Sequence, residues 1–164
     1  MDPTGPAYLG TRLRHLIELL DGDIAAVQAD MGITGFRIRY SAPIRAIAAR
    51  GPLSIRDLAA ATGVTHSAAS QTVARMAKDG LVVLDAGTDA RRRMVRLTPR
   101  AEALLPKLNA EWDATARAAA ALDAELPYPL SRLIEETLDA LRRRPMRARV
   151  TGIAEAADDQ QPPP

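Results

Sequence analysis

Cysteine is absent from the 164-residue sequence, which excludes disulfide bridges, thiolate zinc sites and a redox-sensing thiol. Aromatic side chains are scarce, with one Phe, one Trp and three Tyr, so few of them can stack on a planar molecule. No run of about 20 apolar residues is present, and we expect no membrane span. The opening residues, MDPTGPAY, lack the basic start and apolar core of a signal peptide. We therefore expect a cytoplasmic protein, with which the missing cysteine is consistent.

The sequence also lacks the side chains that most enzymes need. A nucleophile beside a base, a cleft with paired carboxylates, a set of metal ligands and a phosphate-binding loop each require particular residues close together. The two histidines, His15 and His66, lie in separate predicted helices, and no glycine-rich phosphate loop accompanies them. We expect no catalytic site, no cofactor and no bound metal.

What is present is a globular composition, with 47% apolar residues, and an uneven distribution of charge. The formal net charge of the whole chain is only +2. Between Val64 and Arg100, seven basic side chains stand against three acidic ones, which leaves +4 in that stretch. The length suits one domain, and the basic stretch is where a polyanion is expected to bind.

Residues 54–80 predict two short helices joined by a turn. Ser54 and, after the turn, Thr65 are suited to cap the helix starts, because their hydroxyl oxygens accept backbone N–H groups. Gly63 is suited to end the first helix and Gly80 the second. Two short helices joined through a glycine-containing turn are typical of a helix-turn-helix.

The second of these helices has two different faces. Its apolar residues recur at steps of three and four, which predicts a face that packs on the first helix. They are Ala69, Val73, Met76 and Ala77. The polar residues, together with the capping Thr65, are suited to lie in a major groove, where Gln and Arg make bidentate contacts with bases. They are His66, Ser67, Ser70, Gln71 and Arg75. A solvated helix face, or a scaffold that binds no DNA, fits the same pattern.

Residues 81–85 and 93–98 are rich in Val and Leu and predict the two strands of a hairpin. Its tip and returning strand carry one carboxylate, that of Asp89, and four guanidinium groups. These belong to Arg91, Arg92, Arg93 and Arg96. Because Asp89 alone cannot pair with all four, this projecting loop is suited to reach DNA phosphates or a minor groove. A run of charge that only aids solubility is the alternative interpretation.

From residue 9 to residue 143 the chain resembles the MarR family of winged-helix transcriptional regulators. The family's wing motif, Asp-x-Arg followed by a strand that ends in Leu-Thr, is matched by Asp89, Arg91, Leu97 and Thr98. The phrase VTHSAASQTVARMAKDGLV is similar to the recognition helix of the family. The resemblance implies that Asp89 braces the wing by pairing with Arg91, and that Arg91 or a neighbour approaches DNA. The chain departs from the family at Ala101, where the family usually has glycine.

Long amphipathic helices are predicted on both sides of this region. The stripe of the first contains Leu9, Leu13, Leu16, Leu20, Ile24, Val27 and Met31. A second helix, which starts at Pro99, has Leu104, Leu105, Leu108, Trp112, Ala116, Ala119 and Leu122. A third, which follows Pro127 and Pro129, has Leu130, Leu133, Ile134, Leu138 and Leu141. These stripes exceed what one small winged helix can cover, so we expect a homodimer, as the resemblance also implies. Packing within one subunit is the alternative.

The expected fold class is mainly α, or α+β, as a winged helix-turn-helix with terminal dimerisation helices. Within one domain overall, we assign residues 1–35 to the N-terminal dimerisation helix, 36–100 to the winged helix-turn-helix, and 101–143 to the C-terminal dimerisation helices. Residues 144–164 are basic, then acidic and proline-rich, and we expect them to form no regular structure. Arginines around the end of the last helix suit phosphate contacts or capping of that helix, and we favour capping. They are Arg142, Arg143, Arg144, Arg147 and Arg149.

A loop and then a helix over residues 41–50 are predicted ahead of the helix-turn-helix. Five side chains from this segment are expected to fill the core: Phe36, Ile38, Tyr40, Ile44 and Ile47. The resemblance implies a small aromatic ligand between the dimer helices and the DNA-binding lobe. By that analogy the candidate lining residues are His15, Arg37, Tyr40 and Trp112. The alternative for each of these residues is that it packs in the core or is exposed to solvent. Because aromatic residues are scarce, a regulator that binds no ligand is also an open alternative.

A two-fold dimer of such lobes predicts double-stranded DNA with an inverted repeat as its partner, with half-sites about 10 base pairs apart or a multiple of that spacing. We expect a transcriptional regulator that acts as a repressor and is released by a small-molecule ligand. The alternative is a winged-helix module for protein–protein or architectural contacts, without sequence-specific DNA binding. The arginine-rich wing favours the regulator.

Overall fold

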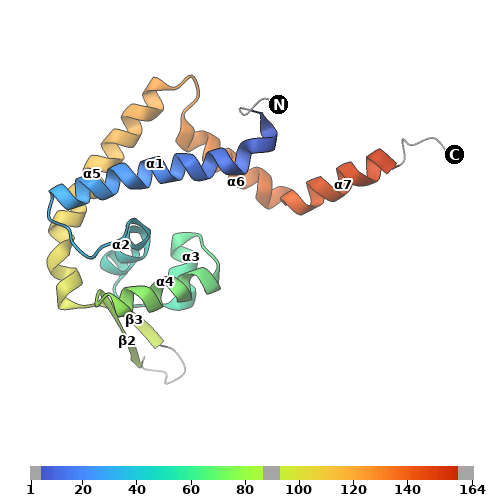
Figure 1. Ribbon diagram of the computed structural model, residues 1–164. Coiled ribbons are helices and arrows are strands. Elements are labelled where there is room, and N and C mark those ends of the chain that lie inside the picture. Colours follow the sequence, from blue (N-terminus) through green and yellow to red (C-terminus); the bar gives the residue numbers. More distant parts are fainter. Residues whose placement is uncertain (1–4, 87–92, 159–164) are drawn as a thin grey trace. The chain divides into compact units, whose positions relative to one another are not determined.

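The computed structural model describes residues 5–86 and 93–158. It is mainly helical with one small antiparallel sheet (Figure 1), which confirms the expected fold class. The chain forms two compact units, Met1–Asp113 and Ala114–Pro164. This division falls inside the long helix α5 (Pro99–Glu125).

In the first unit the helices follow the predicted order. The short 3-10 helix η1 (Pro6–Tyr8) leads into α1 (Leu9–Asp30), and η2 (Ile38–Tyr40) leads into α2 (Ser41–Arg50). The helix-turn-helix consists of α3 (Ile55–Thr62) and α4 (His66–Lys78). The predicted helix over residues 41–50 is confirmed as α2.

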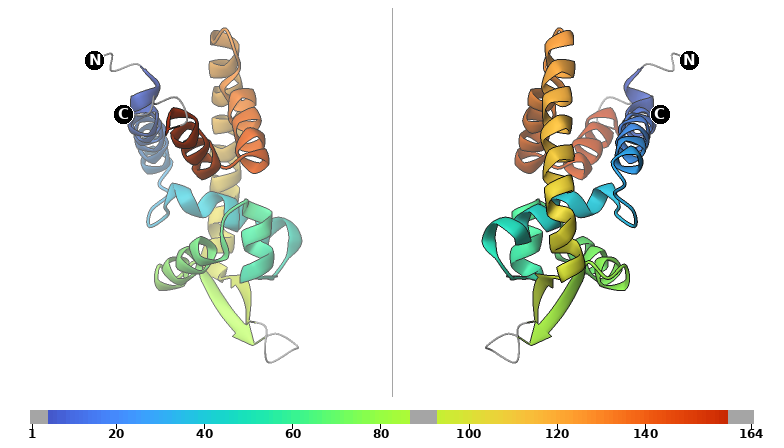
Figure 2. Two further views of the ribbon diagram at one scale, coloured as in Figure 1. Left: turned by 90° about the vertical axis from the view of Figure 1, so that its right-hand side faces the viewer. Right: turned by 90° about the vertical axis from the view of Figure 1, so that its left-hand side faces the viewer.

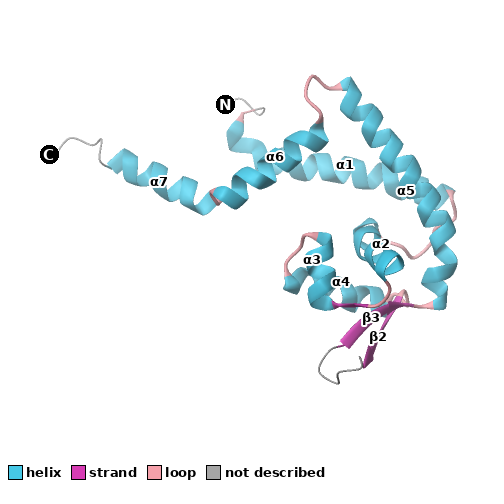
Figure 3. Ribbon diagram, turned by 180° about the vertical axis from the view of Figure 1, so that it is seen from behind, coloured by secondary structure: helices cyan, strands magenta, loops and turns pink. Residues whose placement is uncertain are grey.

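The sheet of the first unit has three strands, β1 (Leu53–Ser54), β2 (Val82–Ala86) and β3 (Arg93–Leu97). Their order is β1-β3-β2, and both pairs are antiparallel. Figure 3 shows that strands occur at this one place among the described residues. The predicted hairpin is confirmed within one residue of each bound, whereas β1 was not predicted.

Both helices of the helix-turn-helix begin at the predicted caps and α3 ends at the predicted glycine, whereas the C-cap of α4 is Asp79, one residue before the predicted Gly80. The N–H of Asp57 donates to Ser54 Oγ over 3.1 Å, and the N–H of Ala68 donates to Thr65 Oγ1 over 3.2 Å. Gly63 ends α3 with a φ of +68°, in the left-handed region that side chains with a Cβ rarely adopt. These three predicted caps are confirmed.

The core of the first unit lies among η2, α2, α3, α4, the sheet and the first turns of α5. Its most fully buried side chains are Tyr40, Ile44, Leu58, Val73, Met76, Leu81, Val82, Val95 and Leu108. Of the five core residues expected before the helix-turn-helix, Tyr40, Ile44 and Ile47 are buried, and Phe36 and Ile38 are half-buried. Because each large apolar side chain contributes about 1.5–3 kcal/mol on burial, this core holds α4 against the sheet and α3.

Thr98 links the end of α4 to the start of α5. Its Oγ1 donates to the carbonyl oxygen of Gly80 over 2.8 Å and accepts from the N–H of Ala101 over 3.2 Å. Ala101, the position at which the chain departs from the resembled family, is fully buried. Helices α4 and α5 are therefore joined by a hydrogen-bonded junction at Thr98.

The second unit contains the end of α5, then α6 (Leu130–Arg143) and α7 (Met146–Asp158). Asp123 accepts hydrogen bonds from the N–H and the hydroxyl of Ser131, across the break at Pro127 and Pro129. These bonds hold the pKa of the Asp123 carboxyl below its usual range. None of the described helices is long and apolar enough to cross a membrane.

The tail differs from the expectation of no regular structure, because residues 146–158 form α7. The segment MRARVTGIAEAAD is rich in Ala and Arg, which are good helix formers, and its helical propensity outweighs the single Gly152. The guanidinium of Arg149 donates to Arg144 O over 3.0 Å and to Ala140 O over 3.1 Å. The expected capping of the preceding helix is therefore confirmed for Arg149. Residues 159–164 lie outside the described part of the chain.

Candidate nucleic-acid interface

Helix α4 separates its apolar and polar residues onto two faces, as predicted. Ala69, Val73 and Met76 are buried in the core, Met76 with 0% exposure. Of the residues expected to face DNA, Ser70 is half-buried, and the others are exposed: Thr65, His66, Ser67, Gln71 and Arg75. The polar face of α4 is thus accessible to solvent along most of its length, where it does not pack against the rest of the described chain.

The polar groups on this face differ in what they can donate. Thr65 Oγ1 already accepts the N–H of Ala68, so its own hydroxyl hydrogen remains for an outside acceptor. Arg75 is exposed and is not among the ion pairs of the described residues. Gln71, one turn before Arg75, offers both an acceptor and two donors. This set suits the donor and acceptor pattern of a major groove.

Only part of the wing can be placed. Asp89, Arg91 and Arg92 lie outside the described residues, so the expected pairing of Asp89 with Arg91 stays a prediction. Arg93 is the first residue of β3 and is exposed. Figure 2 shows β2 and β3 projecting as a hairpin on the side of α4 away from α2.

The structure reveals a partner for one arginine of the wing. The Nε of Arg96 lies 2.8 Å from Oδ2 of Asp85 across the β2–β3 pair, and the carboxylate raises the pKa of Arg96 further above its usual value. From the sequence, Asp89 is the one carboxylate expected beside the four wing arginines, and the pairing of Arg96 with Asp85 is not predicted. The register of the hairpin predicts this ion pair: Asp85 pairs with Met94, so its side chain lies diagonally across from Arg96 on the neighbouring strand.

Charge separates this region from the rest of the chain. Residues 36–100 contain twelve basic and four acidic side chains, a formal charge of +8. Since the whole chain carries +2, the remaining residues carry −6. A local excess of this size raises the concentration of a polyanion at the region and speeds its association.

A polar network fixes the C-terminal end of α4. The phenol of Tyr40, fully buried in the core, donates to Asp79 Oδ2 over 2.7 Å. Arg37 Nε lies 3.4 Å from the same oxygen, and Arg100 donates to the Asp79 carbonyl over 2.6 Å. The hydrogen bond from Tyr40 is the main reason that the pKa of Asp79 lies below its usual range, while burial raises the pKa of Tyr40. Asp79 was missed from the sequence because its partners are distant along the chain.

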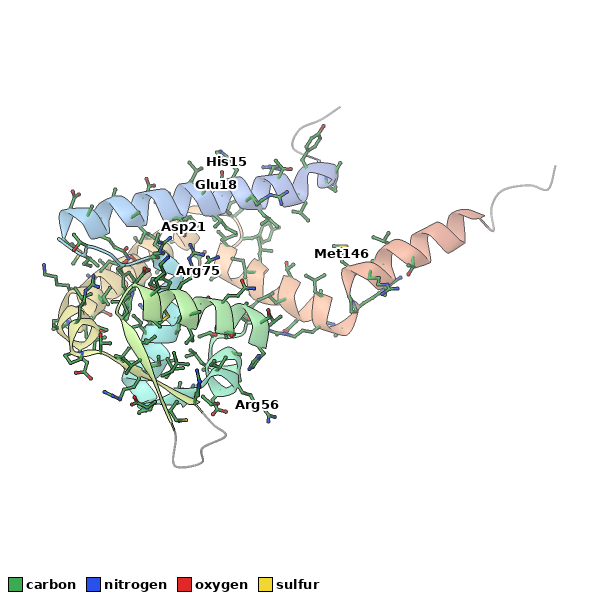
Figure 4. All side chains as sticks on the ribbon, turned by 60° about the horizontal axis from the view of Figure 1, so that its bottom comes forward. His15, Glu18, Asp21, Arg56, Arg75 and Met146 are labelled. Atoms are coloured by element: carbon green, nitrogen blue, oxygen red, sulfur yellow. The ribbon has the colours of Figure 1, made fainter. Side chains whose placement is uncertain are left out.

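The four candidate ligand residues do not share one contact among the described residues. Arg37 and Tyr40 meet at Asp79, but Trp112 is buried with the guanidinium of Arg45 4.4 Å above its ring. His15 is exposed on α1, as Figure 4 shows. A cavity of about 520 Å³ includes only Arg37 of these four. Its lining residues are Gly35, Phe36, Arg37, Lys78, Asp79 and Arg100.

The model of the MarR family matches residues 44–92, which include both helices of the helix-turn-helix. No curated protein sequence gives a significant match. Within the described residues, no group of three His, Asp or Glu side chains is arranged to hold a metal ion.

Solved structures of transcriptional regulators share the fold. The MOSR regulator of M. tuberculosis, crystallised with DNA, is 22% identical with a TM-score of 0.61, over 85% of this chain and 95% of that chain. The PcaV regulator of Streptomyces coelicolor, crystallised with its natural ligand, is 22% identical with a TM-score of 0.59, over 88% and 96%. A probable regulator of Pseudomonas aeruginosa is 26% identical with a TM-score of 0.52, over 83% and 98%. The likeness extends over nearly the whole of each of these chains.

Proposed function

Since this chain belongs to the MarR family of winged helix-turn-helix transcriptional regulators, we propose that it binds an inverted-repeat operator in DNA as a homodimer and represses transcription. The observation that carries the proposal is the exposed polar face of α4 within a region of charge +8. A helix whose opposite face is anchored in a core can enter a major groove without losing its position in the protein.

In this proposal, different residues recognise the bases and bind the DNA backbone. Gln71 and Arg75 contact base edges, with the short polar residues at the start of α4 beside them. The basic side chains of the wing, Arg91, Arg92 and Arg93, contact phosphates or the adjacent minor groove. Phosphate contacts give affinity on any sequence, whereas base contacts select the operator.

Exposed apolar residues on the flanking helices support the homodimer. Leu9, Leu13 and Ile17 on α1 are about half exposed, and so are Leu133 and Ile134 on α6. Helix α6 buries none of its residues. Contiguous exposed apolar surface on a soluble chain marks a contact with a partner, and a second copy related by a two-fold axis would give the symmetric operator that we propose.

Release by a small molecule completes the proposal. The MOSR regulator was crystallised with DNA, and the PcaV regulator with its natural ligand. In this chain the cavity beside Arg37 and Asp79 adjoins the end of the recognition helix. A small aromatic ligand held there would act on the position of α4, and hence on the spacing of the two reading helices.

Sedimentation and fluorescence anisotropy together test the proposal. We expect a dimer at micromolar concentration, and affinity for duplex DNA that falls steeply as salt rises. The logarithmic slope of that fall gives the number of phosphates that the protein neutralises. A monomer that binds no duplex at low salt would contradict the proposal and favour a module for protein–protein contacts.

A further inference from the structure

The unpredicted strand β1 brings the start of α3 beside the wing. In its register with β3, Leu53 pairs with Val95 and Ser54 pairs with Met94. Because the two strands are antiparallel, the chain leaves β1 in the direction of Arg93. Arg56 follows two residues after Ser54, in the first turn of α3. The sheet thus brings the first turn of α3, which contains Arg56, to the end of β3 at which Arg93 stands.

The side chain of Arg56 is exposed and is not among the ion pairs of the described residues. Figure 4 shows it projecting from the ribbon on the side of the molecule where the hairpin lies. The carboxylate next to it in sequence, that of Asp57, is engaged in the cap, where it accepts the hydroxyl of Ser54 over 2.6 Å. The Arg56 guanidinium is therefore available to an anion outside the protein.

We propose that Arg56, together with Arg93, binds the phosphate backbone of DNA beside the wing. The inference rests on the proposed function, and it adds a contact from the first helix of the helix-turn-helix to those of α4 and the wing. In helix-turn-helix proteins the first helix crosses the DNA backbone while the second reads the groove. A guanidinium group forms charge-assisted, bidentate hydrogen bonds with phosphate oxygens. The contact is independent of base sequence.

Replacing the guanidinium with an uncharged group of similar length tests this contact. Arg56→Gln should weaken binding about three- to tenfold at low salt, equally on the preferred operator and on an unrelated duplex. The logarithmic salt slope should fall by about 0.9 for each lost contact, hence by about 1.8 for a dimer. Arg56→Lys should keep most of the slope, because it retains the charge. Arg117→Gln, which removes an exposed arginine from α5, is the matched control and should leave the slope unchanged.

The outcomes separate this inference from the proposed function. If the unaltered protein binds DNA and Arg56→Gln has the same slope, the Arg56 contact is wrong and the function stands. A loss confined to the preferred operator would also overturn the contact, since it would indicate base recognition. An equal loss of slope in Arg117→Gln would overturn it too, because the effect would then come from net charge alone. If the unaltered protein binds no duplex, both proposals fail.

Discussion

Residues 36–100 bury most of their large apolar side chains, whereas the helices on either side expose many of theirs. Met76 on α4 is 0% exposed, but Leu138 on α6 is 41% exposed. Residues 36–100 carry a formal charge of +8, and the rest of the chain carries −6. Residues 36–100 supply most of the core and an excess of basic side chains, whereas the flanking helices leave large apolar side chains exposed. This difference fits our proposal that residues 36–100 bind DNA and that the flanking helices form the dimer.

Charging the apolar stripe of α6 should have the largest effect. Ile134→Glu with Leu138→Glu places two carboxylates on the surface that we expect a second copy to cover, so the dimer should dissociate. Loss of the second half-site should then lower operator affinity about 10²- to 10⁴-fold. Sedimentation and anisotropy measure the two effects. Glu135→Lys, a charge change on the polar side of α6, is the control, and a double variant that stays dimeric would show that the stripe has another role.

Truncating a buried residue of α4 should have the second-largest effect, and this effect should be on the stability of the fold. Met76→Ala should lower the free energy of unfolding by about 2–5 kcal/mol, because it leaves a cavity among α4, α3 and the sheet. Met146→Ala removes the same atoms from a side chain that is 54% exposed and should change stability by less than about 0.5 kcal/mol. Urea denaturation compares the two. If both variants lose the same free energy of unfolding, the difference in burial between Met76 and Met146 does not produce a difference in stability.

Changing the exposed polar face of α4 should alter the sequence specificity of DNA binding more than the overall affinity. Gln71→Ala should cost about 1–3 kcal/mol of discrimination at one base pair of the operator, because it removes a bidentate base contact. Competition between the operator and its point variants measures this. Arg91→Ala and Arg92→Ala provide the contrast, since loss of a phosphate contact should weaken binding on every sequence. A uniform loss in Gln71→Ala would place that residue on the backbone instead.

The network at the end of α4 should give the smallest effect, seen in the pH dependence of stability. Because the pKa of Asp79 is lowered in the folded protein, its contribution is complete above the unfolded value of about 3.9. It is lost as the pH falls through the lower folded pKa. Asp79→Asn and Tyr40→Phe should therefore both flatten the loss of stability between about pH 5 and pH 2. Asp113→Asn, on the exposed side of α5, is the control. Profiles that match the unaltered protein would show that the hydrogen bond from Tyr40 contributes nothing.

Local signals in the sequence predicted the elements that depend on neighbouring residues. Ser54, Gly63 and Thr65 cap where they were expected to, because each acts on backbone groups within a few positions. The bounds of α2 followed from its flanking residues in the same way. The division of α4 into two faces needed only its helical period.

Contacts between residues that are distant along the chain could not be predicted from such local signals. Strand β1 has two residues, too few for any periodicity, and it exists because β3 offers it an edge. The pairs Asp85–Arg96 and Tyr40–Asp79 require the register of the hairpin and the packing of η2 against α4. Helix α7 was missed because overall charge and the terminal prolines were weighed above the helical propensity of residues 146–158.

Selection of duplexes from a random pool by the purified protein tests the central claim most directly. Two copies of α4 related by a two-fold axis predict enrichment of an inverted repeat, with half-sites about 10 base pairs apart or a multiple of that distance. Retained sequences with no shared motif, or with a single unrepeated half-site, would contradict the account of a symmetric dimer that reads DNA through α4.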